Sequence, residues 1–249
     1  MDAPPSELDP RALWPARALP PGLTLFAARA DLDPAAHPDL LAAATPDAQE
    51  ARQVLGWGSA KRRAHWMAGR RAGLALGLRA GWAEPEGDPP QILALPKTGE
   101  PVWSQGARLH PLSLTHSGDW ALAAAAPGCL VGLDYEVGIL DQFYLTDRIC
   151  SAQETTRHRL LDLEHPLDLR RARLGQLWTL KEALLKAFGV GLVAELRHFE
   201  VAAIEPDGVA RFVALHPLHE AIPHPLPAGL LACVGRFEGH PLALAALPR

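Results

Sequence analysis

The chain has 249 residues, enough for one large domain or for two small ones that each bury a hydrophobic core. Its hydrophobic residues (48%) and charged residues (21%) match an ordinary soluble protein, and a formal net charge of -4 gives no sign of a nucleic-acid-binding surface. Its three cysteines are scattered without a CxxC pair, which argues against a disulfide framework and against a zinc site.

The ends and apolar runs of the sequence predict where the protein works. The first ten residues, MDAPPSELDP, carry acids and prolines where a signal peptide needs basic and apolar residues. The apolar stretch at 121–126 is too short to cross a bilayer. We therefore expect a cytoplasmic protein that binds neither nucleic acid nor membranes.

The predicted elements begin with a proline-rich, extended arm at residues 1–22. A buried strand follows at 23–28, then a helix at 46–57 and a longer helix from 60 to about 82 that Ser59 would cap. A proline-rich loop at 84–96 leads to strands at 112–115 and 120–126. A turn at 127–129 precedes a strand at 129–137, which we expect to form a hairpin with the strand before it.

The rest of the chain turns helical and then alternates strand-like runs. Helices are predicted at 141–164 and 168–188, and strands at 199–204, 209–215, 230–237 and 242–247. This order indicates an α+β fold with two similar halves, although no internal repeat is strong enough to prove their relation. We place the N-terminal half at 23–128 and the C-terminal half at 129–249.

Two acids lie two positions apart in the strand-like run at 129–137. Asp134 and Glu136 would share one face of that strand, where they repel each other unless a cation or water lies between them. Tyr135 would pack on the other face. A solvated surface strand explains this pattern equally well when it is taken alone.

The run WTLKEALLKAFGVGL at 178–192 is more informative. Trp178, Glu182 and Lys186 recur every four residues and form one helical stripe, while Gly189 and Gly191 would end the helix. A solvated Glu–Lys pair is the alternative. Together with Asp134 and Glu136, Glu182 completes a set of three carboxylates that suits Mg²⁺ and phosphate chemistry, with Lys181 and Lys186 as nearby cations.

Two further features are candidates for binding phosphate. His116 lies between Thr115 and Ser117 at the end of a strand, where small neighbours would leave its ring accessible. A basic cluster occupies the long helix: Lys61, Arg62, Arg63, Arg70 and Arg71. A structural histidine and a solvated helix face are the alternatives.

These motifs, in this order, resemble the 4′-phosphopantetheinyl transferases of the surfactin-synthetase and enterobactin-synthetase type. GLDYE at 132–136 resembles the family pattern G-I/V-D-I/V-E, with Tyr135 in place of the usual Ile or Val. WTLKEALLKAFGVGL matches W-x-x-K-E-A/S-x-x-K-x-x-G-x-G-L/F in full, and THS at 115–117 resembles an S-H-S element. KRRAHWMAGRRA at 61–72 resembles the family's basic stretch. GEPVW at 99–103 resembles its Gly-x-Pro turn, although Glu100 stands where many members have lysine.

The resemblance implies two pseudo-twofold α/β halves with coenzyme A at their interface. It implies that Asp134, Glu136 and Glu182 hold Mg²⁺, and that His116 and Lys186 contact the coenzyme A pyrophosphate. It implies that Arg70 and Arg62 bind the 3′-phosphate of coenzyme A. Thr115 stands where the family usually has serine. The length suits the monomeric members of this family rather than its short trimeric relatives, so we expect a monomer.

The implied reaction moves 4′-phosphopantetheine from coenzyme A to a serine of an apo acyl or peptidyl carrier protein and releases 3′,5′-adenosine bisphosphate. Glu182, Lys186 and His116 are the catalytic candidates. Glu182 would take the serine proton directly or through a water, and a water on the metal is the alternative base because a metal-bound carboxylate is weakly basic. The alternatives to an enzyme of this kind are a catalytically inactive coenzyme A-binding module and a different Mg²⁺-dependent nucleotide enzyme. No P-loop or GxGxxG supports the latter.

Overall fold

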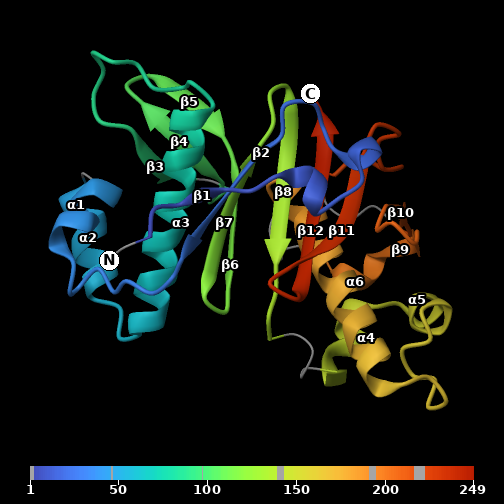
Figure 1. Ribbon diagram of the computed structural model, residues 1–249. Helices are drawn as coiled ribbons and strands as arrows, with labels where there is room; N and C mark the ends of the chain where they lie inside the picture. The colour runs from blue at the N-terminus through green and yellow to red at the C-terminus, as the bar shows by residue number, and fades with distance from the viewer. Residues whose placement is uncertain (1–2, 46, 97, 139–142, 191–194, 216–221) are drawn as a thin grey trace. The chain divides into compact units, whose positions relative to one another are not determined.

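The computed structural model describes residues 3–45, 47–96, 98–138, 143–190, 195–215 and 222–249 (Figure 1). The chain divides into two compact units. Unit 1 contains residues 1–9 and 22–126, and unit 2 contains residues 10–21 and 127–249. None of the helices in the described ranges has the length and apolar character needed to span a membrane.

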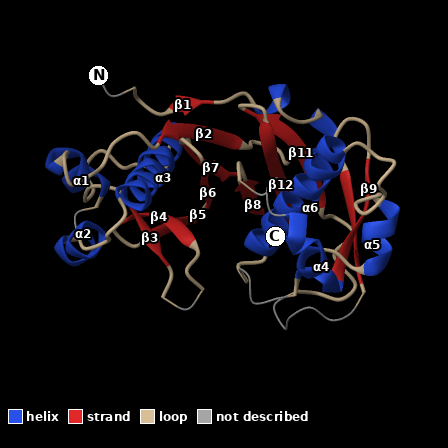
Figure 2. Cartoon of the chain, turned by 90° about the horizontal axis from the view of Figure 1, so that it is seen from below, coloured by secondary structure: helices blue, strands red, loops and turns tan. Residues whose placement is uncertain are grey.

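Unit 1 is built on an antiparallel sheet of four strands in the order β1-β2-β7-β6. The strands are β1 (Ser6–Glu7), β2 (Thr24–Arg29), β6 (Ser113–Ser117) and β7 (Trp120–Ala125). Helix α3 (Ala60–Arg79) packs on the face of β2, β7 and β6 (Figure 2). The buried face of β7 is almost entirely alanine, which keeps the helix and the sheet close.

A second antiparallel sheet of unit 1 has the order β3-β4-β5 and borders the same core. Its strands are β3 (Gln91–Ala94), β4 (Pro101–Gln105) and β5 (Arg108–Pro111), and the short helices α1 (Pro38–Ala44) and α2 (Ala48–Leu55) precede α3. The sequence predicts none of α1, β3, β4 and β5, because prolines interrupt their hydrophobic pattern. Trp103 of β4 is fully buried against α3.

Unit 2 is built on a three-stranded antiparallel sheet in the order β11-β12-β8. The strands are β8 (Cys129–Tyr135), β11 (Leu231–Phe237) and β12 (His240–Pro248). Helix α6 (Leu167–Ala187) packs across β12 and β8 and contributes most of the hydrophobic core of this unit. Leu177, Leu180 and Leu184 are fully buried, as the periodicity predicts.

The remainder of unit 2 flanks α6. It comprises η4 (Phe143–Leu145), α4 (Thr146–Ile149), α5 (Ala152–Arg157), η6 (Leu196–His198) and the hairpin of β9 (Phe199–Ile204) and β10 (Ala210–Ala214). The predicted helix at 141–164 is wrong as one element. Ser151 caps α5 through its side chain, and its extended backbone breaks the helix there. Residues 141 and 142 lie outside the described ranges.

The predicted hairpin between 120–126 and 129–137 is also wrong. Strand β7 pairs with β2 and β6, whereas β8 pairs with β12, from Leu242 opposite Tyr135 to Pro248 opposite Cys129. The turn at 127–129 therefore connects the two units instead of two paired strands. Its glycine, Gly128, has a φ of 70°.

The proline-rich segment 10–21 contains η1 (Pro10–Ala12) and η2 (Ala16–Ala18) and contacts unit 2 through side chains. The indole nitrogen of Trp14 donates to the carbonyl of Leu242 at 3.2 Å, and the indole is 3% exposed. Arg17 donates to Glu205 and Asp207, both at 2.7 Å. This segment is thereby attached to the β9–β10 turn and to β12.

Within each unit the chain follows the same path. A strand (β2 or β8) leads to a long helix (α3 or α6), and a hairpin (β6–β7 or β11–β12) then places its second strand beside the first strand. Both long helices end in the same hydrogen-bonded cap. Gly81 has a φ of 72° and Gly189 a φ of 67°, and the next residue of each bonds back to the carbonyl five positions earlier. Gly191 lies outside the described residues.

Candidate functional site

The predicted acidic residues of unit 2 come together where β8 ends against α6. Asp134 is in β8, and Glu136 follows the end of that strand. Lys186 of α6 donates to Asp134 Oδ1 at 2.7 Å and to the carbonyl of Leu133 at 3.1 Å. Glu182 lies one turn before Lys186 on the same face of α6. We call Asp134, Glu136, Glu182 and Lys186 together the acidic cluster.

A glycine in β8 brings the strand and the helix close enough for this contact. A Cβ atom at Gly132 would lie 1.8 Å from the carbonyl oxygen of Ala183 and 2.5 Å from the amide nitrogen of Ala187. Any larger residue would therefore push α6 away from β8. The glycine of GLDYE thus sets the distance between Asp134 and the α6 residues Glu182 and Lys186.

Glu182 is the most perturbed member of the acidic cluster. Its side chain is buried, with 8% of the residue exposed, and Oε1 has no hydrogen-bond partner among the described residues. Burial raises the pKa of Glu182 to about 7, and the negative charge of Asp134 adds to the shift. Lys186 lowers this pKa and Glu136 raises it further. Glu182 is therefore poised to exchange a proton near neutral pH.

The acidic cluster fits a divalent cation by the chemistry of its donors. Its three carboxylates lie close enough for Asp134 and Glu136 to raise the pKa of Glu182, and a cation would relieve that repulsion. The uncompensated Oε1 of Glu182 offers one oxygen ligand of the kind that Mg²⁺ prefers. Among the described residues, no three His, Cys, Asp or Glu side chains are already arranged as a metal-binding group.

Lys181 does not belong to the acidic cluster, contrary to the sequence interpretation. It is fully buried and donates to Glu154 at 2.6 Å, to the carbonyl of Ile149 at 2.7 Å and to that of Leu196 at 2.9 Å. All three donors of its ammonium group are thus used inside the core. Lys181 connects α6 to α4, α5 and η6 and has no free charge to offer a phosphate.

In unit 1, His116 is exposed at the end of β6, as the sequence predicts. Its ring stacks on that of His65, with centroids 4.8 Å apart and planes at 25°. His65 lies on α3 and is 8% exposed, and its Nε2 is 2.8 Å from the carbonyl of Gly118. Because a carbonyl only accepts, Nε2 of His65 carries the proton. Thr115 is buried (4% exposed), on the opposite face of β6 from His116.

The basic cluster of α3 is largely engaged with its own unit. Arg70 pairs with Glu50 at 2.6 Å and lies over the ring of Trp66 at 4.8 Å. Arg62 is exposed, and its guanidinium lies 4.3 Å from the centroid of Trp57. Arg63 pairs with Asp33. Arg62 is thus the more accessible of the two arginines assigned to the 3′-phosphate, and Arg70 would have to leave Glu50 or share it.

Sequence reasoning missed His65 and Glu50, which support His116 and Arg70. His65 stands inside the basic run KRRAHW and has no partner nearby in sequence, so its stacking on β6 leaves no local signal. Glu50 lies in the predicted helix at 46–57, but 20 positions separate it from Arg70. The sequence offered one signal for the stacked pair: each of two elements that border the same core, α3 and β6, carries a histidine.

Comparison with known proteins agrees with the motifs. Residues 130–231, which contain the acidic cluster, match the model of the 4′-phosphopantetheinyl transferase superfamily. The chain is 35% identical over 125 residues to the 4′-phosphopantetheinyl transferase psf-1 of Bacillus pumilus. That alignment covers 49% of this chain and 49% of the relative, so the chain matches about half of the relative's length. Residues 130–231 are therefore similar to the 4′-phosphopantetheinyl transferase superfamily, and this region contains the motifs GLDYE and WTLKEALLKAFGVGL.

Proposed function

We propose that the protein transfers 4′-phosphopantetheine from coenzyme A to a serine hydroxyl of an apo acyl or peptidyl carrier protein, in a Mg²⁺-dependent reaction that releases 3′,5′-adenosine bisphosphate. The observation that carries the proposal is the acidic cluster. A buried glutamate with a pKa of about 7 lies beside a lysine–aspartate pair, within the region that matches the superfamily. An ordinary solvated Glu–Lys pair would be exposed and would keep the usual glutamate pKa.

Each residue of the acidic cluster has a proposed task. Asp134, Glu136 and Glu182 would hold Mg²⁺, which when bound supplies positive charge that stabilises phosphate oxygens. Lys186 supplies a second positive charge through an ammonium group that Asp134 and the carbonyl of Leu133 hold in place. Glu182 would accept the proton of the incoming serine, directly or through a water.

Glu182 suits the role of base because of its surroundings. A base acts most efficiently when its pKa is near the operating pH, and in the metal-free protein burial beside Asp134 brings the pKa of Glu182 to about 7. A bound Mg²⁺ would lower this pKa, so a water on the metal is the alternative base. Lys186 at the same time limits the rise of that pKa. The two residues are one helical turn apart, so α6 places the proton acceptor and the positive charge on one face.

Three residues of unit 1 keep proposed binding roles. His116 would donate to the pyrophosphate, since its ring is exposed and held by stacking on His65. Arg62 and Arg70 would hold the 3′-phosphate, whereas Thr115 is buried on the face of β6 opposite His116 and is given no contact with the ligand. We further propose that the common path of the chain in the two units reflects the pseudo-twofold relation typical of this family.

The test is transfer itself. The full chain is incubated with coenzyme A, Mg²⁺ and apo carrier proteins of the fatty-acid, polyketide and nonribosomal-peptide types, and intact carrier mass is recorded. We expect one phosphopantetheine added per carrier, and no addition with excess EDTA. An unchanged mass for every carrier would contradict the proposal.

Calorimetry separates the alternatives. Coenzyme A bound more tightly with Mg²⁺ but never transferred would support the inactive binding module. A preference for ATP or GTP over coenzyme A would support a different nucleotide enzyme. Binding of coenzyme A with Mg²⁺ together with transfer is the result that the proposal requires.

A further inference from the structure

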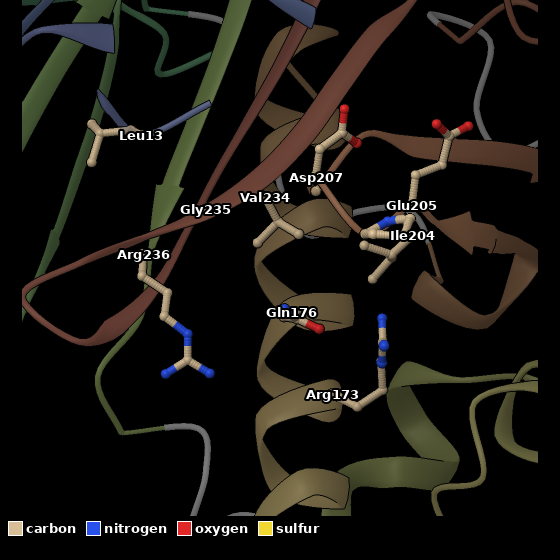
Figure 3. A pocket seen from close by; sticks show the side chains of 11 residues that line it. Leu13, Arg173, Gln176, Ile204, Glu205, Asp207, Val234, Gly235 and Arg236 are labelled. Carbon is tan, nitrogen blue, oxygen red and sulfur yellow. The ribbon is translucent and has the colours of Figure 1, made fainter. Parts of the chain in front are cut away.

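Unit 2 contains a cavity of about 490 Å³, and its lining residues include no member of the acidic cluster. Figure 3 shows side chains that line it. Its walls come from the segment 10–21, from α6, from the turn between β9 and β10, and from β11. The lining residues used below are Leu13, Arg173, Gln176, Ile204, Val234 and Arg236. The volume is within the range of small-molecule sites, ~300–1,000 Å³. Arg173 precedes Glu182 by about 13 Å along the axis of α6.

The acids at the cavity already share a cation, Arg17. Glu205 and Asp207 line it, but both accept from Arg17, with Nη2 2.7 Å from each carboxylate and Nε 3.1 Å from Asp207. This contact lowers the pKa of Asp207, mainly through the hydrogen bond from Arg17. The two carboxylates and Arg17 together carry one net negative charge. The other two arginines of the cavity, Arg173 and Arg236, carry two positive charges.

Arg173 has no counter-ion among the residues that the structure describes. Its side chain is half-buried in the cavity wall, and it forms no hydrogen bond or ion pair among the described residues. Burial lowers the pKa of Arg173. The pKa of His158 is also lowered, mainly by burial and in part by the positive charge of Arg173. Leaving a guanidinium partly desolvated and unpaired costs free energy. Arg236 adds a second guanidinium, which donates to the carbonyl of Gly239 at 3.3 Å.

Polar atoms make up most of the exposed lining of the cavity, and hydrocarbon makes up the smaller part. Leu13, Ile204 and Val234 line that smaller part. Two glycines allow its walls to touch through their backbones. A Cβ at Gly208 would lie 2.2 Å from the carbonyl oxygen of Val234, and one at Gly235 would lie 2.2 Å from that of Leu13. The shape of the cavity is therefore fixed by backbone contacts.

We propose that this cavity binds a small organic anion. The guanidinium of Arg173 holds its carboxylate or phosphate group, with Arg236 and Gln176 as further donors, and its short apolar body lies against Leu13, Ile204 and Val234. Arginine suits this task because its planar fork bonds two oxygens of a carboxylate or a phosphate. The ligand would supply the counter-ion that Arg173 lacks among the described residues.

The test titrates hexanoate and hexyl phosphate into ¹⁵N-labelled full-length protein in EDTA. The amide signals of Gly208 and Gly235 report on the cavity, and calorimetry gives the Kd. Hexylammonium, which has the same chain and the opposite charge, is the control. We expect one or both anions to shift the two glycine signals, and hexylammonium to leave them unchanged. The anion with the lower Kd shows whether the cavity prefers a carboxylate or a phosphate head group.

Variants assign the binding to Arg173. Arg173→Gln should weaken the tighter anion at least tenfold, whereas Arg173→Lys, which keeps the charge, should weaken it less. Arg236→Gln should give a smaller loss because its side chain is exposed. Glycine signals that do not move in the wild-type protein, or an anion Kd unchanged in Arg173→Gln, would overturn the proposal.

Two measurements separate this site from the fold and from transferase activity. Arg173→Gln should not lower the thermal midpoint of the ligand-free protein, since it removes an unpaired charge. A clear drop would show a structural role for Arg173 and would overturn the assignment. Glu182→Gln should leave the anion Kd unchanged, so a failed transfer assay would not bear on the cavity.

Discussion

The two units use the same framework of a strand, a long helix and a hairpin, but they bring helix and sheet together differently. In unit 1 three glycines of α3, Gly69, Gly73 and Gly77, lie on the buried side of the helix, which packs against the alanines of β7. In unit 2 the closest approach is made from the strand, where a Cβ at Gly132 of β8 would meet the backbone of α6. Helix α6 has one buried glycine, Gly175, and carries the long side chains of Lys181, Glu182 and Lys186.

This difference has a chemical consequence. The buried residues of α3 include no charged side chain apart from the titratable His65, and its arginines interact at partly exposed positions with Glu50, Trp66 and Trp57. Helix α6 buries two charged residues in succession: Lys181 with a full set of partners and Glu182 with an unsatisfied oxygen. A buried charge with all its partners is compatible with a purely structural role, whereas an unsatisfied buried charge indicates a site for chemistry.

The largest effect is expected at Lys181. Lys181→Met would leave Glu154 buried with an uncompensated charge, because both residues are fully buried and 2.6 Å apart. We expect a loss of about 3–5 kcal/mol in the free energy of unfolding, measured by urea denaturation. The double variant Lys181→Met with Glu154→Gln should recover part of this loss. A loss in the single variant as small as that of a surface pair, below ~1 kcal/mol, would contradict the role assigned to Lys181.

The glycine comparison gives the next effect. Gly132→Ala should cost about 3 kcal/mol of unfolding free energy or more, because the new Cβ meets backbone atoms that cannot move aside. Gly69→Ala in α3 is the matched control: its Cβ would meet only Leu114 Cδ1 at 3.9 Å, an ordinary contact. This control should gain ~0.5–1 kcal/mol from helix propensity. Equal effects at the two positions would refute the proposed difference in packing.

Glu182 makes the stability of the metal-free protein depend on pH. Its folded pKa of about 7 is above the ordinary value of 4.5, so its contribution is fully present below pH 4.5 and is lost as the pH rises through 7. This pKa shift corresponds to a loss of roughly 3 kcal/mol in the free energy of unfolding at pH 8. In EDTA, Glu182→Gln should therefore be more stable than wild type at pH 8, and the two should converge at pH 5. Parallel stability curves across this range would contradict the perturbed pKa.

The smallest effect is expected at His65 in unit 1, and it depends on the proposed function. His65→Leu would remove the ring beneath His116 and should raise the KM for coenzyme A several-fold with little change in kcat. His65→Phe keeps the stacking but loses the bond to Gly118, and it should stay closer to wild type. A fall in kcat alone, or an unchanged KM in His65→Leu, would remove His65 from this positioning role.

Regular periodicity made the long elements predictable. The helices near 60–82 and 168–188, the cap at Ser59 and the late strands all lie within a few residues of their predicted positions. The pairing of β8 with β12 was not predictable, because more than a hundred residues separate the partners and the turn at 127–129 suggests a local hairpin. The spacing in α6 predicted that Glu182 and Lys186 share one face, and the motifs grouped Glu182 with Asp134 and Glu136. In the structure Lys186 pairs with Asp134, and the charge of Asp134 raises the pKa of Glu182.

What local patterns cannot show is which partner satisfies a buried charge. Lys181 and Glu182 are adjacent and look equivalent in sequence, yet Glu154 neutralises Lys181 from 27 residues away. His65 likewise finds its stacking partner 51 positions later in the chain. These contacts arise from the packing of whole elements, so a structure is needed to separate the fully paired lysine from the glutamate that has an unsatisfied oxygen.

The most direct test of the central claim compares the initial rate of phosphopantetheine transfer by the wild-type protein and by Glu182→Gln. Both are assayed at pH 7 with coenzyme A, Mg²⁺ and the same apo carrier, by intact mass, after circular dichroism has shown that both are folded. If Glu182 holds the metal and accepts the serine proton, Glu182→Gln should transfer at least ~100-fold more slowly. A rate within about threefold of wild type would contradict the account, since it would leave the buried carboxyl without a part in the reaction.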